Sequence, residues 1–97
     1  MASDVNEITM NFKEDEVLLV KEIDKVILSK GAWATIIFKY QNLDRKTNEY
    51  GKEQYSIRRY QKRSGVFNQK SKFNISSQDQ AKKIIDALQN WISESGE

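Results

Sequence analysis

Alternating side chains predict a run of β-strands through the middle of the chain. Residues 33–41, WATIIFKYQ, are rich in β-branched and aromatic residues and contain no breaker, which is typical of a strand. Residues 54–62, QYSIRRYQK, predict the next strand, and residues 66–75 predict its hairpin partner. The tight turn between them is Ser64-Gly65. The polar stretch 42–52 predicts a flexible loop.

The region before these strands has a weaker pattern. Residues 17–28, VLLVKEIDKVIL, fit a helical stripe and a strand equally well, and their β-branched content favours a strand broken near Asp24. Residues 29–31 then form a turn. Residues 1–12 are mostly polar, so we expect a flexible N-terminal arm and one domain over residues 13–97.

The last part of the chain changes period from two to about 3.6. Ser77 followed by Gln80 has the spacing of a capping box, and it predicts a helix start. The apolar positions that follow form one helical stripe: Ala81, Ile84, Ile85, Leu88, Trp91 and Ile92. Strands followed by one helix predict an α+β fold, with a four-stranded antiparallel sheet and a C-terminal amphipathic helix.

Strand parity divides the predicted sheet into two faces. We expect one face to be cationic and aromatic, formed by Arg58, Tyr60, Lys62, Lys70 and Lys72, with Lys39 joining them. We expect the opposite face to pack on the helix through Ile57, Phe73, Ile75, Ile36 and Phe38. The alternative is a solvated lysine-rich face that serves solubility only.

Positive charge is concentrated in the segment that contains these predicted strands. Residues 30–75 carry a net charge of +8, between an N-terminal part of −4 and a C-terminal part of −2. A basic middle predicts one positive surface. Cations for phosphates beside rings for bases are what single-stranded nucleic acid requires. No helix-turn-helix or finger pattern favours reading of a duplex.

The composition argues against several classes of protein. The chain has no cysteine and no histidine, which excludes disulfides, thiolate nucleophiles and Cys/His zinc sites. No serine lies in a nucleophile motif, and no glycine-rich phosphate loop is present. We therefore expect no catalytic residue, no metal and no cofactor. The absence of a signal-peptide pattern or a long apolar run suggests a cytoplasmic protein without a membrane anchor.

Two segments of the chain have a familiar order of motifs. The segment YSIRRYQKRSG, followed by KSKFNISSQDQAKKIIDAL, resembles the positive cofactor four family of single-stranded-DNA-binding transcriptional coactivators and its bacterial and phage relatives. The matching features are Ile57-Arg58-Arg59-Tyr60, the Ser64-Gly65 turn, Lys70 with Lys72, and Ile75-Ser76. The resemblance covers roughly residues 25–92.

This resemblance implies a curved four-stranded antiparallel sheet followed by a helix. It also implies a homodimer whose paired sheets hold single-stranded DNA with little sequence preference. Arg58 would meet the DNA, and Lys70 and Lys72 would supply cations before the helix. The family often has an aromatic residue directly after the motif tyrosine, where this chain has Gln61. Base stacking would then fall to Tyr60 or Trp33.

The sequence therefore predicts a non-catalytic single-stranded-DNA-binding protein of transcription, replication or recombination, in a bacterial or phage-infected cell and associated with the nucleoid. RNA binding, or a protein-interaction adaptor that binds no nucleic acid, remain the alternatives. One small sheet is too short to cover the whole helical stripe, so we expect a homodimer interface at Leu88, Trp91 and Ile92.

Overall fold

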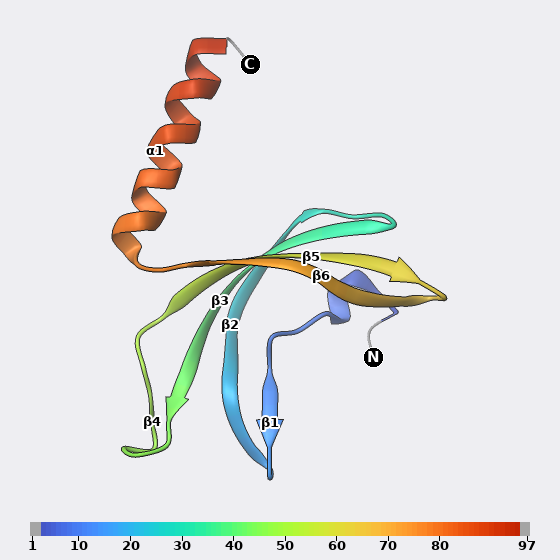
Figure 1. Cartoon of the computed structure of the whole chain (residues 1–97), viewed down its shortest axis with the longest axis vertical. Coiled ribbons are helices and arrows are strands. Elements are labelled where there is room, and N and C mark those ends of the chain that lie inside the picture. The colour runs from blue at the N-terminus through green and yellow to red at the C-terminus, as the bar shows by residue number, and fades with distance from the viewer. Residues whose placement is uncertain (1–2, 96–97) are drawn as a thin grey trace.

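The computed structural model describes residues 3–95, which form a curled antiparallel sheet and one C-terminal helix (Figure 1). A short 3₁₀ helix, η1, spans Val5–Glu7. The strands are β1 (Phe12–Glu14), β2 (Val17–Ser29), β3 (Trp33–Asp44), β4 (Glu49–Tyr50), β5 (Gln54–Arg63) and β6 (Val66–Ile75). The helix α1 spans Gln78–Ser95. The α+β class is confirmed, with six strands where the sequence predicted four.

The sheet order is β1-β2-β3-β5-β6, and β4 pairs with the end of β3. Residues 17–28 are a strand, as favoured, and the irregularity near Asp24 is a bulge between Glu22 and Asp24. The predicted flexible loop is shorter than expected, because β3 continues to Asp44 and β4 pairs with it. Asn48, with φ at 59°, takes the left-handed conformation that the tight turn between β3 and β4 requires.

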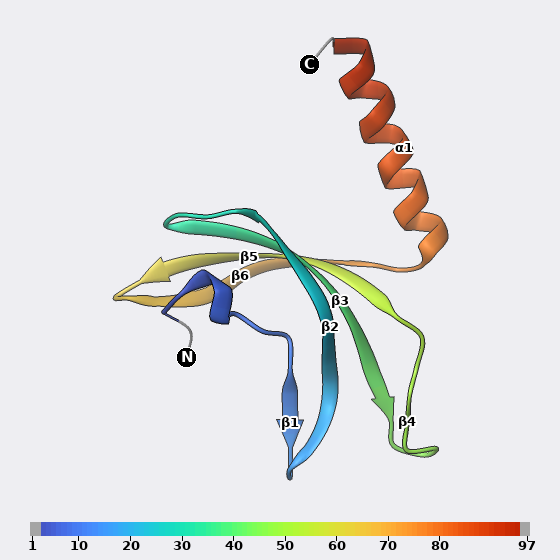
Figure 2. The same cartoon turned by 180° about the vertical axis from the view of Figure 1, so that it is seen from behind.

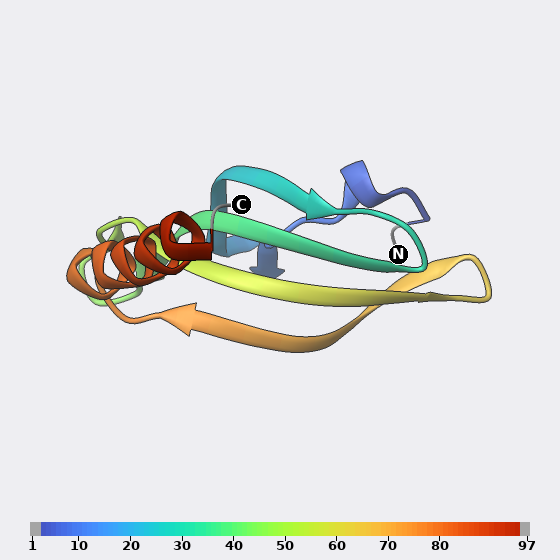
Figure 3. The same cartoon turned by 90° about the horizontal axis from the view of Figure 1, so that it is seen from above.

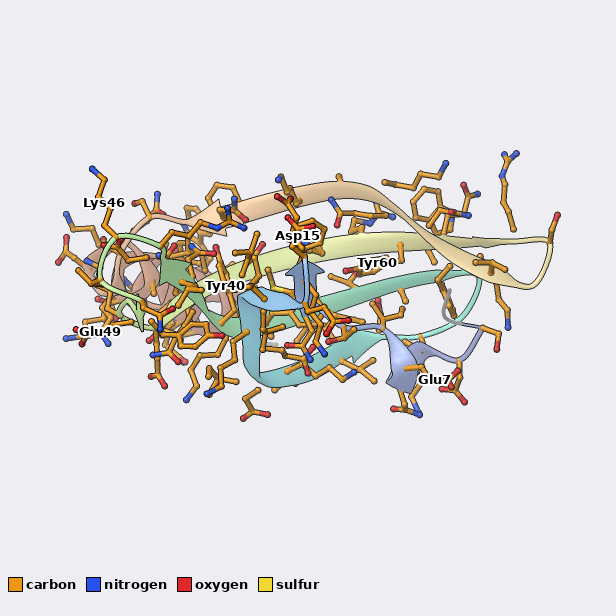
Figure 4. The ribbon with its side chains drawn as sticks, turned by 90° about the horizontal axis from the view of Figure 1, so that it is seen from below. Glu7, Asp15, Tyr40, Lys46, Glu49 and Tyr60 are labelled. Atoms are coloured by element: carbon orange, nitrogen blue, oxygen red, sulfur yellow. The ribbon has the colours of Figure 1, made fainter. Side chains whose placement is uncertain are left out.

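The core lies on the concave face of the sheet. The N-terminal segment covers this face, which we call the covered face; Figure 4 looks toward it and labels Tyr40 and Tyr60. The core residues are Ile8, Met10, Ile36, Phe38, Tyr40 and Tyr60. The strand β3 therefore alternates as predicted, with its Ala34-to-Tyr40 side buried.

The N-terminal residues depart from the predicted flexible arm, because Ile8 and Met10 are buried against the sheet. Polar contacts from β2 hold the segment in place. The Lys25 ammonium donates to the carbonyl oxygens of Asn6 and Ile8 at 2.7 and 2.6 Å. A Glu22 carboxylate oxygen accepts from the Met10 backbone N–H at 3.1 Å. A mostly polar segment thus supplies the second layer of the core.

The predicted assignment of the faces is wrong for β5 and β6. Register pairs Ile36 with Arg58 and Phe38 with Ser56, so Arg58 and Tyr60 share the covered face with the core of β3. Ile57 pairs with Ile37 and with Phe73 on the convex face, which we call the open face. The alternation along β5 was predicted correctly, and the side that it buries was not.

A bulge in the β5–β6 hairpin places on opposite faces residues of β6 that simple alternation would place on the same face. Arg59 pairs with Ser71 and Tyr60 with Gln69, which leaves Lys70 as the extra residue. Phe73 therefore lies on the open face, whereas Phe67, paired with Lys62, packs against the core. The extra residue reverses the alternation of β6, so Phe67 and Phe73 lie on different faces.

The helix does not cover the sheet, which contradicts the predicted packing of the convex side. It starts where expected: Ser77 Oγ accepts from the Gln80 N–H at 3.1 Å, and Gln80 Oε1 accepts from the Ser76 N–H at 2.6 Å. From there α1 rises away from the sheet (Figures 1 and 3), and none of its described residues is buried. Within residues 3–95, no helix is long and apolar enough to cross a membrane.

Candidate nucleic-acid interface

The strands β5 and β6 form the most cationic part of the chain, which we call the cationic hairpin (residues 54–75). It contains six lysines and arginines and no acidic residue, and the next acid along the chain is Asp79. The tip of the hairpin projects from the side of the sheet opposite the start of α1 (Figure 2). Uncompensated positive charge at a projecting tip is favourable for contact with phosphates.

Lys70 and Lys72 lie on β6, the edge strand of the sheet. Residues 68–74 are all exposed, and the bulge at Lys70 interrupts the regular pairing with β5. No ion pair is formed by either lysine in the described structure. Both side chains are therefore free to meet a ligand, as predicted for them.

Trp33 lies at the start of β3, opposite Gln61 and near the tip of this hairpin. Its ring is 41% exposed, and the Arg59 guanidinium lies over it, 4.5 Å from the ring centroid. A guanidinium stacked on one side of an indole fixes the ring and leaves the other side for a flat group. Trp33 is thus the predicted stacking residue that the structure leaves accessible.

Tyr60 is not accessible, which contradicts its predicted role in base stacking. It is 6% exposed and belongs to the core on the covered face. Burial raises the pKa of the Tyr60 phenol above its ordinary value of 10.0, against the opposing effect of the positive Arg58 guanidinium nearby. A buried, neutral phenol serves the core and cannot stack on a base.

Replacing Tyr60 by phenylalanine should flatten the loss of stability in alkali. The folded chain keeps a proton that the unfolded chain releases above about pH 10, so the free energy of unfolding falls as pH rises through that range. The Y60F variant lacks this proton. Urea unfolding at a series of pH values measures the difference, and equal slopes for both proteins above pH 10 would contradict it.

Arg58 occupies a polar niche on the covered face rather than an open cationic surface. Its Nε donates to Ser56 Oγ at 3.3 Å and its Nη1 donates to Gln69 Oε1 at 3.1 Å. The buried Ser56 hydroxyl in turn donates to Asn74 Oδ1 at 2.6 Å. Arg58 also lines a concave cavity of about 450 Å³ between the N-terminal segment and the sheet. It is half-buried, so its first role is to satisfy the buried Ser56 hydroxyl and to bond β5 to Gln69 of β6.

The last two predicted contact residues, Lys39 and Lys62, lie on different faces. Lys39 is on the open face, 3.7 Å from a Glu53 carboxylate oxygen. It does not join Arg58, Lys62 and Lys72 as predicted. Lys62 is exposed near the hairpin tip, with its ammonium 5.4 Å from the centroid of the Phe67 ring. Lys62, Lys70, Lys72 and Trp33 remain as accessible members of the predicted site.

The sequence analysis missed Arg59, the exposed arginine beside Trp33. The local pattern gives no signal for this contact, because only the register of β3 with β5 brings the two side chains together: Thr35 pairs with Arg59 and Trp33 with Gln61. Residues one step apart diagonally on the same face are within reach of long side chains.

The described residues offer no cluster for metal binding. Residues 3–95 contain no group of three acids, histidines or cysteines that could hold a metal ion. The predicted dimer residues Leu88, Trp91 and Ile92 lie exposed on α1, between 49% and 65% accessible. No family model, curated protein or solved structure gives a significant match to this chain.

Proposed function

We propose that this chain is a non-catalytic protein that binds single-stranded DNA with little sequence preference and acts as a homodimer. The observation that carries the proposal is the cationic hairpin, six exposed or half-exposed cations without an acid, with the ring of Trp33 beside it. Phosphate contacts supply affinity without reading sequence, and stacking on a ring accepts any base.

The path of the strand differs from the one that the sequence suggested. A flat cationic face is not available, since Tyr60 is buried and Lys39 lies on the opposite side from Arg58. We place the backbone along the exposed edge of β6, past Lys72 and Lys70, and one base on Trp33. The resemblance to the positive cofactor four family supports single-stranded DNA as the ligand, and a role in transcription, replication or recombination in the cytoplasm of a bacterial or phage-infected cell.

The proposal is tested by comparing fluorescent oligo-dT with a blunt duplex of the same length. We expect clear binding of the single strand at low salt and much weaker binding of the duplex. If four of the six hairpin cations contact phosphates, the logarithm of the association constant falls with the logarithm of salt with a slope of about −3.

Two outcomes would overturn parts of the proposal. Equal affinity for duplex would remove the stacking argument. No binding of any nucleic acid at low salt would remove the function and leave a protein-interaction adaptor. Oligo-U serves as the RNA arm: tighter binding of it than of oligo-dT would make RNA the ligand, through contacts to the 2′-hydroxyl.

A further inference from the structure

The open face of the sheet and the helix α1 together leave a large apolar surface uncovered. The exposed fraction of Phe73 is 50%, that of Leu28 55% and that of Val26 56% on the sheet. Ile85, Leu88, Trp91 and Ile92 on the helix are between 49% and 65% exposed. Contiguous apolar patches of this kind are rare on monomeric proteins and mark sites of association.

The two surfaces meet in one apolar groove. Ile37, Ile57 and Ile75 form its floor, and the first half of α1, with Ala81, Ile84 and Leu88, forms its wall. Its volume is about 620 Å³, enough for several apolar side chains. Trp91 and Ile92 lie beyond the groove, on a part of α1 that does not reach the chain's own sheet.

The dimensions of the single chain also indicate that its sheet is incompletely covered. The radius of gyration is 15.6 Å, and the shortest extent of the molecule is 17 Å. A compact domain of about 100 residues has a radius of gyration of about 13 Å. The isolated chain is thus a sheet covered on one side only, with a helix extending from it.

The side-chain pattern of β5 indicates what the open face is for. Over residues 55–58, the covered side of β5 carries Ser56 and Arg58, whereas the open side carries the half-buried Tyr55 and Ile57. The buried Tyr60 lies farther along the covered side. A strand segment that presents its more apolar side to solvent is unfavourable in a monomer. The pattern is favourable where another apolar layer covers the open face.

We propose that two copies associate by reciprocal exchange of their helices, so that α1 of each copy fills the apolar groove of the other. Each chain has one apolar helix that packs on no other surface and one apolar groove that no other element fills. In a dimer with a two-fold axis, each helix can therefore occupy the groove of the other copy. Such contacts are isologous and close at two copies. The inference deepens the homodimer in the proposed function and rests on it, but not on DNA binding.

Mixing two full-length variants tests the exchange. Ile57→Glu places a charge in the groove, and Trp91→Lys places one on the distal part of the helix. Each variant alone should be monomeric, because both of its interfaces are damaged. Mixed, they should form a heterodimer, since the intact helix of the first fills the intact groove of the second. Light scattering coupled to size exclusion, with one variant labelled, measures the mass.

The outcomes are distinguishable. A wild-type monomer at tens of micromolar would overturn the homodimer and the exchange together. If the wild type is a dimer but the two mixed variants do not form a heterodimer, the exchange alone is overturned. Contact of helix with helix, or of sheet with sheet, would give this result, because the mixture would then contain no interface in which both sides are unmutated. Leu28→Glu, at a half-exposed groove position, replaces Ile57→Glu if that variant does not fold. Asn90→Lys, on the opposite side of α1, is the matched control and should remain dimeric.

Discussion

Replacing Phe38 with alanine should lower the free energy of unfolding by about 3–5 kcal/mol. The ring is 1% exposed at the centre of β3, in the core formed by the covered face and the N-terminal segment. Removing it leaves a cavity that Ile36 and Tyr40 cannot fill, because their backbone is held in the sheet on both sides. Small domains have total stabilities of about 5–15 kcal/mol, so the variant should unfold at a much lower urea concentration.

The matched control for this prediction is Phe12→Ala. The same ring is removed there, but it is 52% exposed on the short strand β1. Its loss should cost clearly less than the loss of Phe38, because less apolar surface returns to water. A control as damaging as Phe38→Ala would mean that the core is not on the covered face.

Local pattern was sufficient to predict where the four long strands and the helix lie, but not the short strands β1 and β4. The strands β3, β5 and β6 fall within a few residues of their predicted limits, because alternation and turn residues are properties of the chain itself. The helix starts after Ser77 for the same reason, since its capping contacts are made within a few residues.

Which face of β5 is buried could not be predicted in this way. The sequence shows Ile57 beside Arg58 and favours burial of the isoleucine, whereas the register with β3 places Arg58 opposite Ile36 on the covered face. Arg58 is acceptable there because Ser56 and Gln69 accept its hydrogen bonds. Long-range pairing, and not the local pattern, decides which side of an alternating strand faces the core.

Two further differences between the prediction and the structure also arise from features that the local pattern does not show. The N-terminal segment is polar overall, and only its contacts to Lys25 and Glu22, distant in the chain, place Ile8 and Met10 in the core. The bulge at Lys70 shifts the pairing of β5 with β6 by one residue, and no local sequence pattern indicates this shift. The predicted cations Lys62, Lys70 and Lys72 are therefore exposed, but they do not share the flat face that the sequence suggested.

The double variant Lys70→Ala/Lys72→Ala should weaken binding of oligo-dT about 25-fold at 0.1 M salt. Each phosphate contact on a single strand contributes about 0.7 to the salt slope, so losing two lowers the slope by about 1.4 and the association constant by about 1.4 logarithmic units relative to 1 M salt. Both lysines are exposed on β6, so the free energy of unfolding should stay within about 0.5 kcal/mol of wild type. Fluorescence anisotropy over a series of salt concentrations gives both quantities.

The matched control carries the same charge change away from the cationic hairpin. Lys82→Ala/Lys83→Ala also removes two exposed cations, but from α1, and it should change the salt slope much less. Equal losses for the two variants would mean that net charge, and not the hairpin, attracts the strand. Trp33→Ala separates stacking from charge, because it should weaken binding by about 1–3 kcal/mol at every salt concentration and leave the slope unchanged. A change of slope without a parallel loss of affinity in that variant would assign Trp33 to holding Arg59 in place rather than to contact with a base.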